Sequence, residues 1–502
     1  MHELRELGLA SEIVDSRAYE HALTRFRENR ILMPTFAQLA DPLAGGDALR
    51  ATLAGVDPDA ADPRNLFRVH WHNAADRSGL AQLPEHLVLP PSLTGVEAPI
   101  LIALADRFPM IHSHKVLAAY GVLAPRIVTG QFDPMIQRAV WPSTGNYCRG
   151  GVAISRIMGC RGVAVLPEGM SQERFDWLAR WVVEPEDVIR TPGTESNVKE
   201  IYDRCAILRQ DPENVVLNQF AEFGNHLVHY LATGKALERL AAAYAANHPG
   251  ARPWGFVSAS GSAGTLGAGD YLKERNGTRI VAVEALECPT MLENGFGEHN
   301  IQGIGDKHIP LIHNVMNSDY VVAVSDRATD QLNVLFNTPA GRGFLADRHG
   351  VPQDLLDQLG SLGLSSVCNV VAAIKVARDA QLGPDDLLLT VATDGAPMYA
   401  TELDKAERRD FPDGFDAAAA GTVFGEHVLG ADSEHVLELG THERTRIFNL
   451  GYYTWVEQQG VPLSAFESRR RQETWDQVRT FLPVWDELIG EFNRRSGVAR
   501  VA

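Results

Sequence analysis

The sequence between residues 92 and 403 alternates between short apolar segments and longer segments with helical periodicity. The apolar segments are rich in Val, Ile and Leu and are bounded by Gly, Pro or Asp; they are residues 162–166, 256–259, 279–283, 320–324 and 387–391. Such short and uniformly apolar segments are typical of parallel strands buried on both faces. Helical segments such as 221–244 and 369–380 lie between them. This alternation predicts an α/β fold in which helices cover both faces of parallel sheets.

The two ends of the chain differ from this central part. We predict an N-terminal extension over residues 1–91, a catalytic core over 92–403 and a mainly helical C-terminal extension over 404–502. Residues 41–64 are rich in Gly, Asp, Ala and Pro, which favours a loop or linker. Near the C-terminus, apolar residues recur every three or four positions, as on one face of a helix: Trp475, Val478, Phe481, Leu482, Trp485, Leu488 and Phe492. We expect this face to pack on the core, with a contact between two copies as the alternative.

The composition limits the classes of protein to which the chain can belong. Its 502 residues, 45% of them hydrophobic, exceed what one simple domain needs. Acidic residues outnumber basic ones 64 to 46, and the net charge of −18 disfavours nucleic acid or an anionic membrane as the main partner. We recognise neither a signal peptide nor a membrane-spanning apolar run. The five scattered cysteines resemble reduced thiols, so we expect a cytoplasmic protein.

Three short motifs together supply what is needed to hold an aldehyde cofactor that carries a phosphate. Lys115 precedes an apolar run, so its amine can be partly desolvated and can form an imine. The polar turn 143–146 offers donors for a carboxylate, and the glycine-rich turn 261–265 offers backbone N–H groups and a helix dipole for a phosphate. Taken one at a time, the three motifs are also compatible with a surface lysine, a helix cap and an ordinary turn. The set indicates a pyridoxal phosphate (PLP) enzyme that acts on a small amino acid.

Residues 92–403 resemble the fold-type-II PLP enzymes, the group of the tryptophan synthase β-chain and cysteine synthase. Seven segments occur in the family's order: Ser113-His114-Lys115, Ser143-Thr144-Gly145-Asn146, Pro167-Glu168-Gly169, Asn218-Gln219-Phe220, Gly261 to Thr265, Ile301-Gln302-Gly303-Ile304-Gly305 and Gly363-Leu364-Ser365-Ser366. The resemblance implies a two-domain fold in which a smaller domain, about residues 130–235, is inserted in the larger one. It also implies a homodimer.

The resemblance further implies a role for each matching residue. Lys115 would hold PLP as an imine and later move the α-proton of the substrate. Asn146 would contact the ring oxygen of the cofactor, and Ser366, less surely Ser365, its pyridine nitrogen. The expected phosphate-binding residues are Gly261, Ser262, Ala263, Gly264 and Thr265, and the expected substrate-binding residues are Ser143, Thr144, Gln219 and Gly303. A serine beside the ring nitrogen makes the cofactor a weaker electron sink than an aspartate would, which favours loss of a β-substituent through an aminoacrylate.

Departures from the family pattern leave the reaction open. Tyr147 stands where a small residue is common, Ala263 replaces a glycine of the phosphate turn, and residues 306–308 change the turn after Gly305. We expect β-replacement on a serine- or cysteine-type amino acid. The first alternative is β-elimination, as in a cysteine desulfhydrase or a serine/threonine dehydratase, and the second is a non-catalytic scaffold.

Two His-x-His pairs, His70-Trp71-His72 and His112-Ser113-His114, are the features that most resemble metal ligands. Neither pair has a set of carboxylates nearby in the sequence, so we expect no metal site.

Overall fold

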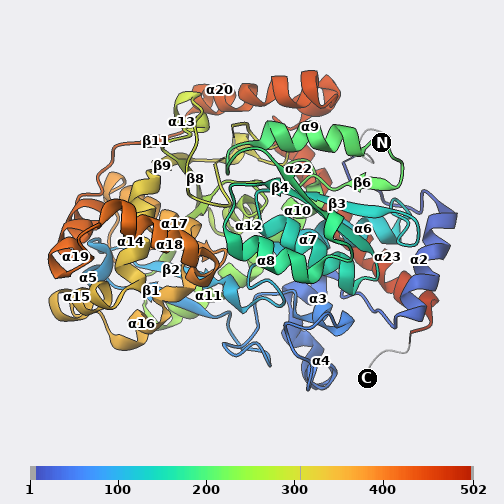
Figure 1. The fold of residues 1–502 in the computed structure, drawn as a ribbon, viewed down its shortest axis with the longest axis horizontal. Coiled ribbons are helices and arrows are strands. Elements are labelled where there is room, and N and C mark those ends of the chain that lie inside the picture. The colour runs from blue at the N-terminus through green and yellow to red at the C-terminus, as the bar shows by residue number, and fades with distance from the viewer. Residues whose placement is uncertain (1–6, 306, 499–502) are drawn as a thin grey trace.

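The computed structural model describes residues 7–305 and 307–498, which form two sheets covered by helices (Figure 1). Within these residues the larger sheet has seven strands, in the order β1 (His86–Leu89), β2 (Ile100–Leu104), β10 (Asp386–Ala392), β7 (Arg252–Ala259), β8 (Arg279–Ala285), β9 (Tyr320–Val324) and β11 (Val436–Glu438). The smaller sheet has four, in the order β5 (Val188–Thr191), β4 (Arg161–Pro167), β3 (Arg138–Pro142) and β6 (Asn214–Val216). Each apolar segment predicted to be a strand lies in one of them.

The strands of both sheets are mostly parallel. β2, β10, β7, β8 and β9 run in one direction, and all the pairs of the smaller sheet are parallel. Only the edge strands of the larger sheet, β1 and β11, pair in the antiparallel sense within the described chain. These two strands lie in the predicted N- and C-terminal extensions, so both ends of the chain extend the central sheet. The smaller sheet lies between β2 and β7 in sequence. The predicted α/β, fold-type-II class is confirmed, whereas the domain boundaries stay predictions.

Alternate residues of each central strand enter different cores, as the two-residue period of a strand requires. Ile280 and Ala282 of β8 belong to a core shared with α11 (Gly234–Asn247) and α12 (Leu266–Asn276). Val281 and Val283 belong to a second core shared with α17 (Leu364–Asp379). The larger sheet is therefore covered on both faces, and the middle of β8, residues 280–283, is apolar on both.

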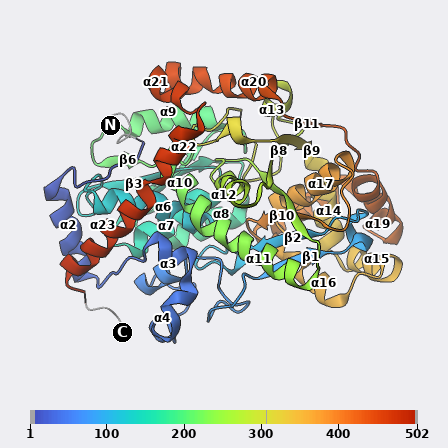
Figure 2. The ribbon, with the colours of Figure 1, turned by 180° about the vertical axis from the view of Figure 1, so that it is seen from behind.

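The helices follow the strands in sequence and surround both sheets (Figures 1 and 2). Near the smaller sheet lie α6 (Lys115–Val128), α7 (Asn146–Ile157), α8 (Gln172–Trp181), α9 (Val198–Leu208) and α10 (Phe223–Val228). Later in the chain come α13 (Thr290–Glu293), α14 (Asp326–Asn337), α15 (Pro339–His349), α16 (Gln353–Gln358), α18 (Ala400–Asp410) and α19 (Ala417–Phe424). The predicted helix 221–244 is α10 and α11 joined by the π-helical turn His229–Thr233.

The N-terminal residues are more helical than their composition indicates. They form α2 (Ser16–Glu28), α3 (Phe36–Ala40), α4 (Gly46–Leu53) and α5 (Pro91–Thr94). The prediction of a loop over residues 41–64 is therefore wrong for α4. That helix contains Ala, Leu and Arg, which favour helices, and the Gly, Asp and Pro residues that suggested a loop lie mostly around it.

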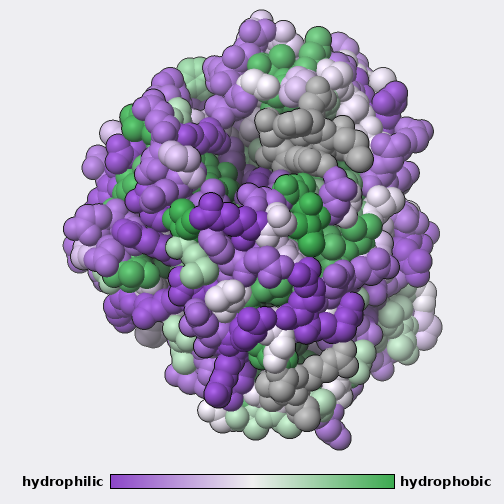
Figure 3. Space-filling view, turned by 90° about the vertical axis from the view of Figure 1, so that its right-hand side faces the viewer, coloured by the Kyte–Doolittle hydropathy of each residue, from purple (hydrophilic) through white to green (hydrophobic). Residues whose placement is uncertain are grey.

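The C-terminal residues form α20 (Thr441–Tyr452), α21 (Leu463–Ser468), α22 (Gln472–Arg479) and α23 (Phe481–Ser496). The apolar stripe of α23 packs on its own chain, beside α2 (Figures 1 and 2). The indole of Trp485 donates to the carbonyl of Ala10 at 2.8 Å, and the ring of Phe492 lies 5.1 Å from that of Phe26. The face of the molecule that bears α2 and the end of α23 is mostly hydrophilic, with small groups of apolar residues (Figure 3).

Candidate active site

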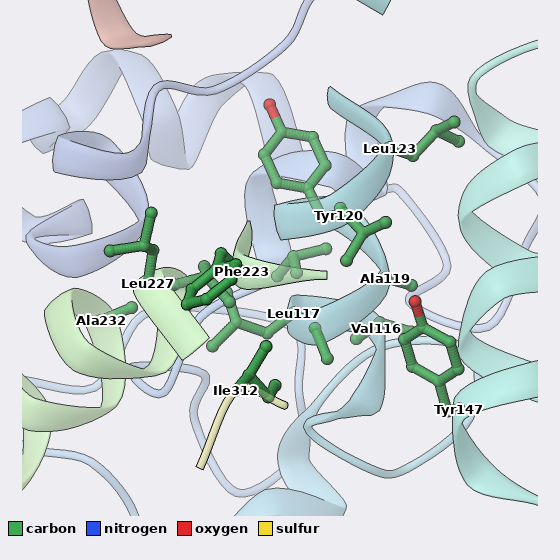
Figure 4. Packing of buried hydrophobic residues seen from close by; sticks show 14 of the residues in the cluster. Val116, Leu117, Ala119, Tyr120, Leu123, Tyr147, Phe223, Leu227, Ala232 and Ile312 are labelled. Carbon is green, nitrogen blue, oxygen red and sulfur yellow. The ribbon is translucent and has the colours of Figure 1, made fainter. Parts of the chain in front are cut away.

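Lys115 is the first residue of α6, a helix that is buried along its whole length. Figure 4 shows Leu117 of this helix close to Phe223 of α10, while the ring of Tyr120 points away from them. The Tyr120 hydroxyl donates to the carbonyl of Pro34, and its ring lies 6.0 Å from that of Phe36. Only 8% of Lys115 is exposed. Because a helix enclosed on all sides cannot shift without disturbing a close-packed core, the lysine is held in a fixed place.

Lys115 lines a small cavity; about 370 Å³ of space that no atom fills lies within it and in front of it, open solvent included. The other lining residues are Ser143, Thr144, Asn146, Tyr147, Gln219, Phe220, Gly261, Ser262, Gln302, Gly303 and Thr393. Several of these segments follow the carboxyl ends of parallel strands, where α/β proteins bind their ligands. The structure therefore brings together the lysine, the polar turn, the glutamine and the start of the glycine-rich turn. Sequence reasoning assigned no role to Phe220, Gln302 or Thr393.

Four predicted residues, Ala263, Gly264, Thr265 and Ser366, lie outside this lining. The first three complete the turn that leads into α12. Ala263 has φ of 63°, in the left-handed region that glycine occupies without strain. An alanine is strained in this conformation, whereas a glycine at this position would not be. Ser366 lies in the first turn of α17, and its buried hydroxyl has no hydrogen-bond partner in the part of the chain that the structure describes.

The glycine-rich turn is packed too closely for larger residues. A Cβ atom on Gly261 would lie 2.4 Å from the carbonyl oxygen of Gly303, and one on Gly264 would lie 2.2 Å from Oδ1 of Asn225. Asn225 in turn donates to the carbonyl of Gln219 and to the hydroxyl of Ser262, both at 3.0 Å. One buried amide thus joins the glycine-rich turn 261–265 to the segment that contains Gln219.

The amide of Asn146 is held on two sides. Its Oδ1 accepts a hydrogen bond from Arg149 at 3.0 Å, and its Nδ2 donates to Asp394 at 2.5 Å. A primary amide has two N–H hydrogens, so one remains for a group in the cavity that Asn146 lines. Burial and the nearby Arg174 lower the pKa of Arg149 to about 10, so this buried guanidinium still carries its charge near neutral pH.

Asp394 connects the amide to a second group of buried residues. Tyr399 donates to the same carboxylate at 2.8 Å, and Arg174 donates to the Tyr399 oxygen at 3.1 Å. Burial raises the pKa of Asp394, although Arg174 and its hydrogen-bond donors act in the opposite direction. The Arg174 guanidinium also occupies the place of a side chain at Gly145, where a Cβ atom would lie 2.4 Å from Nε. Asp394 and Tyr399 therefore help to shape the site rather than form a simple turn.

One buried acid near the cavity had no signal in the sequence. Glu195 follows β5, is 1% exposed, and burial raises the pKa of its carboxyl to about 7. The groups that lower this pKa are, in order of effect, Arg174, the Thr144 hydroxyl, the Gly303 backbone N–H and Lys115.

The histidines near Lys115 are buried and neutral. Nε2 of His114 lies 3.2 Å from the Thr393 hydroxyl, and the His114 and His229 rings are 4.9 Å apart. Burial lowers the pKa of both imidazoles well below the ordinary value. In the described residues, no group of three or more His, Cys, Asp or Glu side chains could hold a metal ion.

The arrangement fits PLP. A buried lysine faces a cavity, a tight backbone turn precedes a helix of 11 residues, an amide keeps one N–H free, and a buried serine hydroxyl lacks a partner. Together the fold and this site define an α/β enzyme of the PLP-binding class.

Comparisons with known proteins agree with this class. The sequence pattern of the family described as pyridoxal-phosphate dependent enzyme matches residues 87–332. Cysteine synthase B of Campylobacter jejuni is 30% identical over 264 residues, which are 50% of this chain and 76% of that protein. A cysteine synthase of Staphylococcus aureus is 28% identical over 262 residues, 52% of this chain and 74% of that protein. The chain therefore belongs to the PLP-dependent enzymes, as a fold-type-II, cysteine synthase-like member, and its cofactor is PLP.

Solved structures show the same fold. An O-acetylserine-dependent cystathionine β-synthase from Helicobacter pylori has a TM-score of 0.51 at 21% identity, over 64% of this chain and 95% of its own. A hydrogen sulfide-producing enzyme from Fusobacterium nucleatum has a TM-score of 0.51 at 21% identity, over 63% and 96%. These matches leave about a third of the chain without a counterpart.

In the described residues no single helix is long and apolar enough to cross a membrane, although the bent pair Gln353–Ser361 and Leu364–Asp379 reaches that length and composition together.

Proposed function

We propose that this enzyme catalyses β-replacement on a serine-type amino acid, with PLP as its cofactor. The observation that carries the proposal is the single cavity in which the Lys115 amine meets the polar turn 143–146 and Gln219. The relatives named cysteine synthases support the same reaction class. When bound, PLP supplies an electron sink for the α-carbon of the substrate.

Lys115 is the group that would hold the cofactor and then move the α-proton. Lys115 lies in the first turn of α6 and lines the cavity, so its amine would be close to the α-carbon of a bound substrate. A base that is already positioned loses little entropy in the proton transfer.

The polar turn and Gln219 would bind the substrate carboxylate. Ser143 and Thr144 line the cavity between β3 and α7, and the Ser143 hydroxyl accepts from the Gly145 backbone N–H at 3.1 Å, which fixes its direction. The remaining N–H of Asn146 would donate to the ring oxygen of the cofactor. Ser366 would face the pyridine nitrogen, and residues 261–265 would bind the phosphate.

Gly303 provides room for the β-substituent and for the second substrate. It has φ of 101° and lines the cavity, and a Cβ atom there would meet nothing within 4 Å. A non-glycine residue would be strained in this conformation and would fill that space.

We further propose a cytoplasmic homodimer. Five free, buried cysteines support a reducing compartment, because secreted proteins usually pair them. The dimer rests on the family resemblance alone.

The test is to add O-acetylserine to the purified enzyme and follow the absorbance of the bound cofactor, then to add sulfide. β-Replacement predicts a new band that disappears on addition of the nucleophile, with cysteine as the product. Pyruvate that accumulates without a nucleophile would assign β-elimination instead. If no serine derivative changes the absorbance of the bound cofactor, both β-replacement and β-elimination are contradicted.

A further inference from the structure

The N- and C-terminal helices, with one residue of α11, enclose an open groove that shares no lining residue with the cavity at Lys115. In Figures 1 and 2, α3 and α4 lie at the lower side of the molecule, toward which α23 runs. About 860 Å³ of the groove is open to water-sized molecules, within the range of about 300–1,000 Å³ that is usual for ligand sites. The proposed β-chemistry makes no use of this groove.

The apolar part of the groove is held in place by the fold. Met33 and Leu39 line the groove and are buried, whereas Leu49 and Phe67 line it and are half-buried. The side-chain amide of Asn493, on α23, donates to the carbonyl of Met33 at 2.8 Å and accepts from the Met33 N–H at 3.1 Å. A fixed apolar surface can cover the apolar part of a ligand without first being ordered, which lowers the cost of binding.

The charge along the groove is opposite to that of the protein as a whole. Acidic residues outnumber basic ones 64 to 46 in the chain. Five charged residues line the groove, one acidic and four basic: Asp41, Arg30, Arg64, Lys235 and Arg494. Asp41 is already paired with Arg239 at 2.7 Å, and Arg64 is paired with Asp62 at 2.6 Å. The unpaired charge that remains along the groove is therefore positive.

The three remaining cations, Arg30, Lys235 and Arg494, have no ion pair among the residues that the structure describes. They come from separate elements: Arg30 follows α2, Lys235 is in α11, and Arg494 is in the last turn of α23. Cations that the fold gathers at one groove repel one another, and an anion bound among them would relieve that repulsion. The groove therefore combines an apolar surface with a preference for negative charge.

We propose that this groove binds a small organic acid with a carboxylate head and an apolar body, such as a medium-chain fatty acid. The carboxylate would lie among Arg30, Lys235 and Arg494, and the apolar body would lie against Leu49 and Phe67. Binding is non-covalent and independent of the β-chemistry. Because such a ligand would contact both α4 and α23, it should stabilise the folded protein.

Three ligands that differ in charge and apolar length test the proposal. The measurement is isothermal titration calorimetry of the holoenzyme with decanoate, together with its thermal unfolding. We expect one decanoate per chain, a Kd below about 1 mM and a raised Tm. Acetate lacks the apolar body, and decyltrimethylammonium carries the opposite charge, so neither should bind where decanoate saturates. Equal binding of decyltrimethylammonium, or no saturable binding of decanoate, would overturn the proposal.

Variants assign the binding to this groove. Arg494→Glu should raise the Kd of decanoate about tenfold, because an ion pair is lost and a like charge takes its place. Arg348→Glu is the matched control: Arg348 is also an exposed residue in the last turn of a helix, so the loss of its interaction with the helix dipole is similar. This control should keep the wild-type Kd. An equal rise in both variants would overturn the role of the groove.

A third variant fills the groove without touching the core. Ala48 lines the groove from α4 and is exposed, so the ring in Ala48→Trp should occupy the space of the apolar body and weaken decanoate binding. Thermal unfolding and cofactor absorbance verify that each variant is folded. A wild-type Kd in folded Ala48→Trp would contradict the proposal.

Two other outcomes would place the ligand or the groove differently. Displacement of decanoate by O-acetylserine would put decanoate in the catalytic cavity and overturn the proposal, since the two sites share no lining residue. Absence of decanoate binding, together with loss of a dimer in Arg494→Glu, would assign the groove to a contact with a second copy of the chain. A holoenzyme that binds decanoate in the groove but acts on no serine derivative would contradict the proposed function alone.

Discussion

Replacing Gly264 with alanine should weaken cofactor binding, because the neighbours of this residue leave no room for a methyl group. A Cβ atom would lie 2.2 Å from Oδ1 of Asn225, whereas ordinary contact begins at 3.4 Å. Asn225 is buried, and its hydrogen bonds to Gln219 and Ser262 prevent it from moving freely. The substitution must therefore displace the amide that joins the glycine-rich turn 261–265 to the segment that contains Gln219.

The size of the effect follows from these contacts. Displacing Asn225 weakens two hydrogen bonds, each worth about 1 kcal/mol net, and overpacking of a close-packed site costs a similar amount. If about 2 kcal/mol of this cost falls on the cofactor-bound state, the Kd for PLP rises about 30-fold, since 1.4 kcal/mol is a factor of ten.

The assay is a titration of the apoenzyme with PLP, followed by the absorbance of the bound cofactor. Gly343→Ala is the matched control: this residue lies in α15 and is exposed, and a Cβ atom there would meet nothing within 4 Å. The control should bind PLP with the wild-type Kd. A wild-type Kd in Gly264→Ala as well would refute the idea that the turn is held by this packing.

Three other changes test different parts of the account. Trp485→Ala removes a ring that is 1% exposed, together with its hydrogen bond to Ala10. In urea titrations the variant should lose about 3–5 kcal/mol of the free energy of unfolding. A loss below about 1 kcal/mol would contradict the packing of α23 on the N-terminal residues. Arg149→Met removes the donor to Oδ1 of Asn146 and should shift the absorbance of the bound cofactor, because the amide loses its fixed orientation; an unchanged spectrum would argue against this role. Burial raises the pKa of Glu284 to about 7, above its ordinary value of 4.5, so the folded state binds more protons between these pH values and stability falls as pH rises through that window. The fall should be on the order of 3 kcal/mol for this group. Urea unfolding at pH 5 and pH 8 measures the difference in stability between the wild type and Glu284→Gln, and this difference should change by that order. A difference that is the same at both pH values would contradict the raised pKa of Glu284.

The parts of the fold that depend on local pattern could be predicted from the sequence. Residues 280–283 of strand β8 are all apolar because alternate residues enter two cores, and that uniform stretch is visible in the sequence alone. Lys115, the turn 143–146 and the turn 261–265 could be found because each keeps a local motif. Helix α4 could not, since the Gly, Asp and Pro residues that surround it dominate the composition of its region.

The remaining part of the site depends on contacts between distant residues. Asn146 and Asp394 are 248 positions apart, and only the folded chain brings the amide and the carboxylate within 2.5 Å. Arg149 looks like an ordinary helix residue until its burial and its bond to Asn146 are seen. Glu195 carries no motif, and only the folded chain shows that it is buried.

The most direct test of the central claim is to reduce the purified holoenzyme with borohydride and to map the peptide that carries the cofactor. Lys115 and Lys375 are the two buried lysines among those that the structure describes, and Lys375 is paired with Asp432 at 3.6 Å. The cavity predicts a single modified peptide that contains Lys115. Modification of Lys375 or of a surface lysine, or no modification at all, would contradict the assignment of this site.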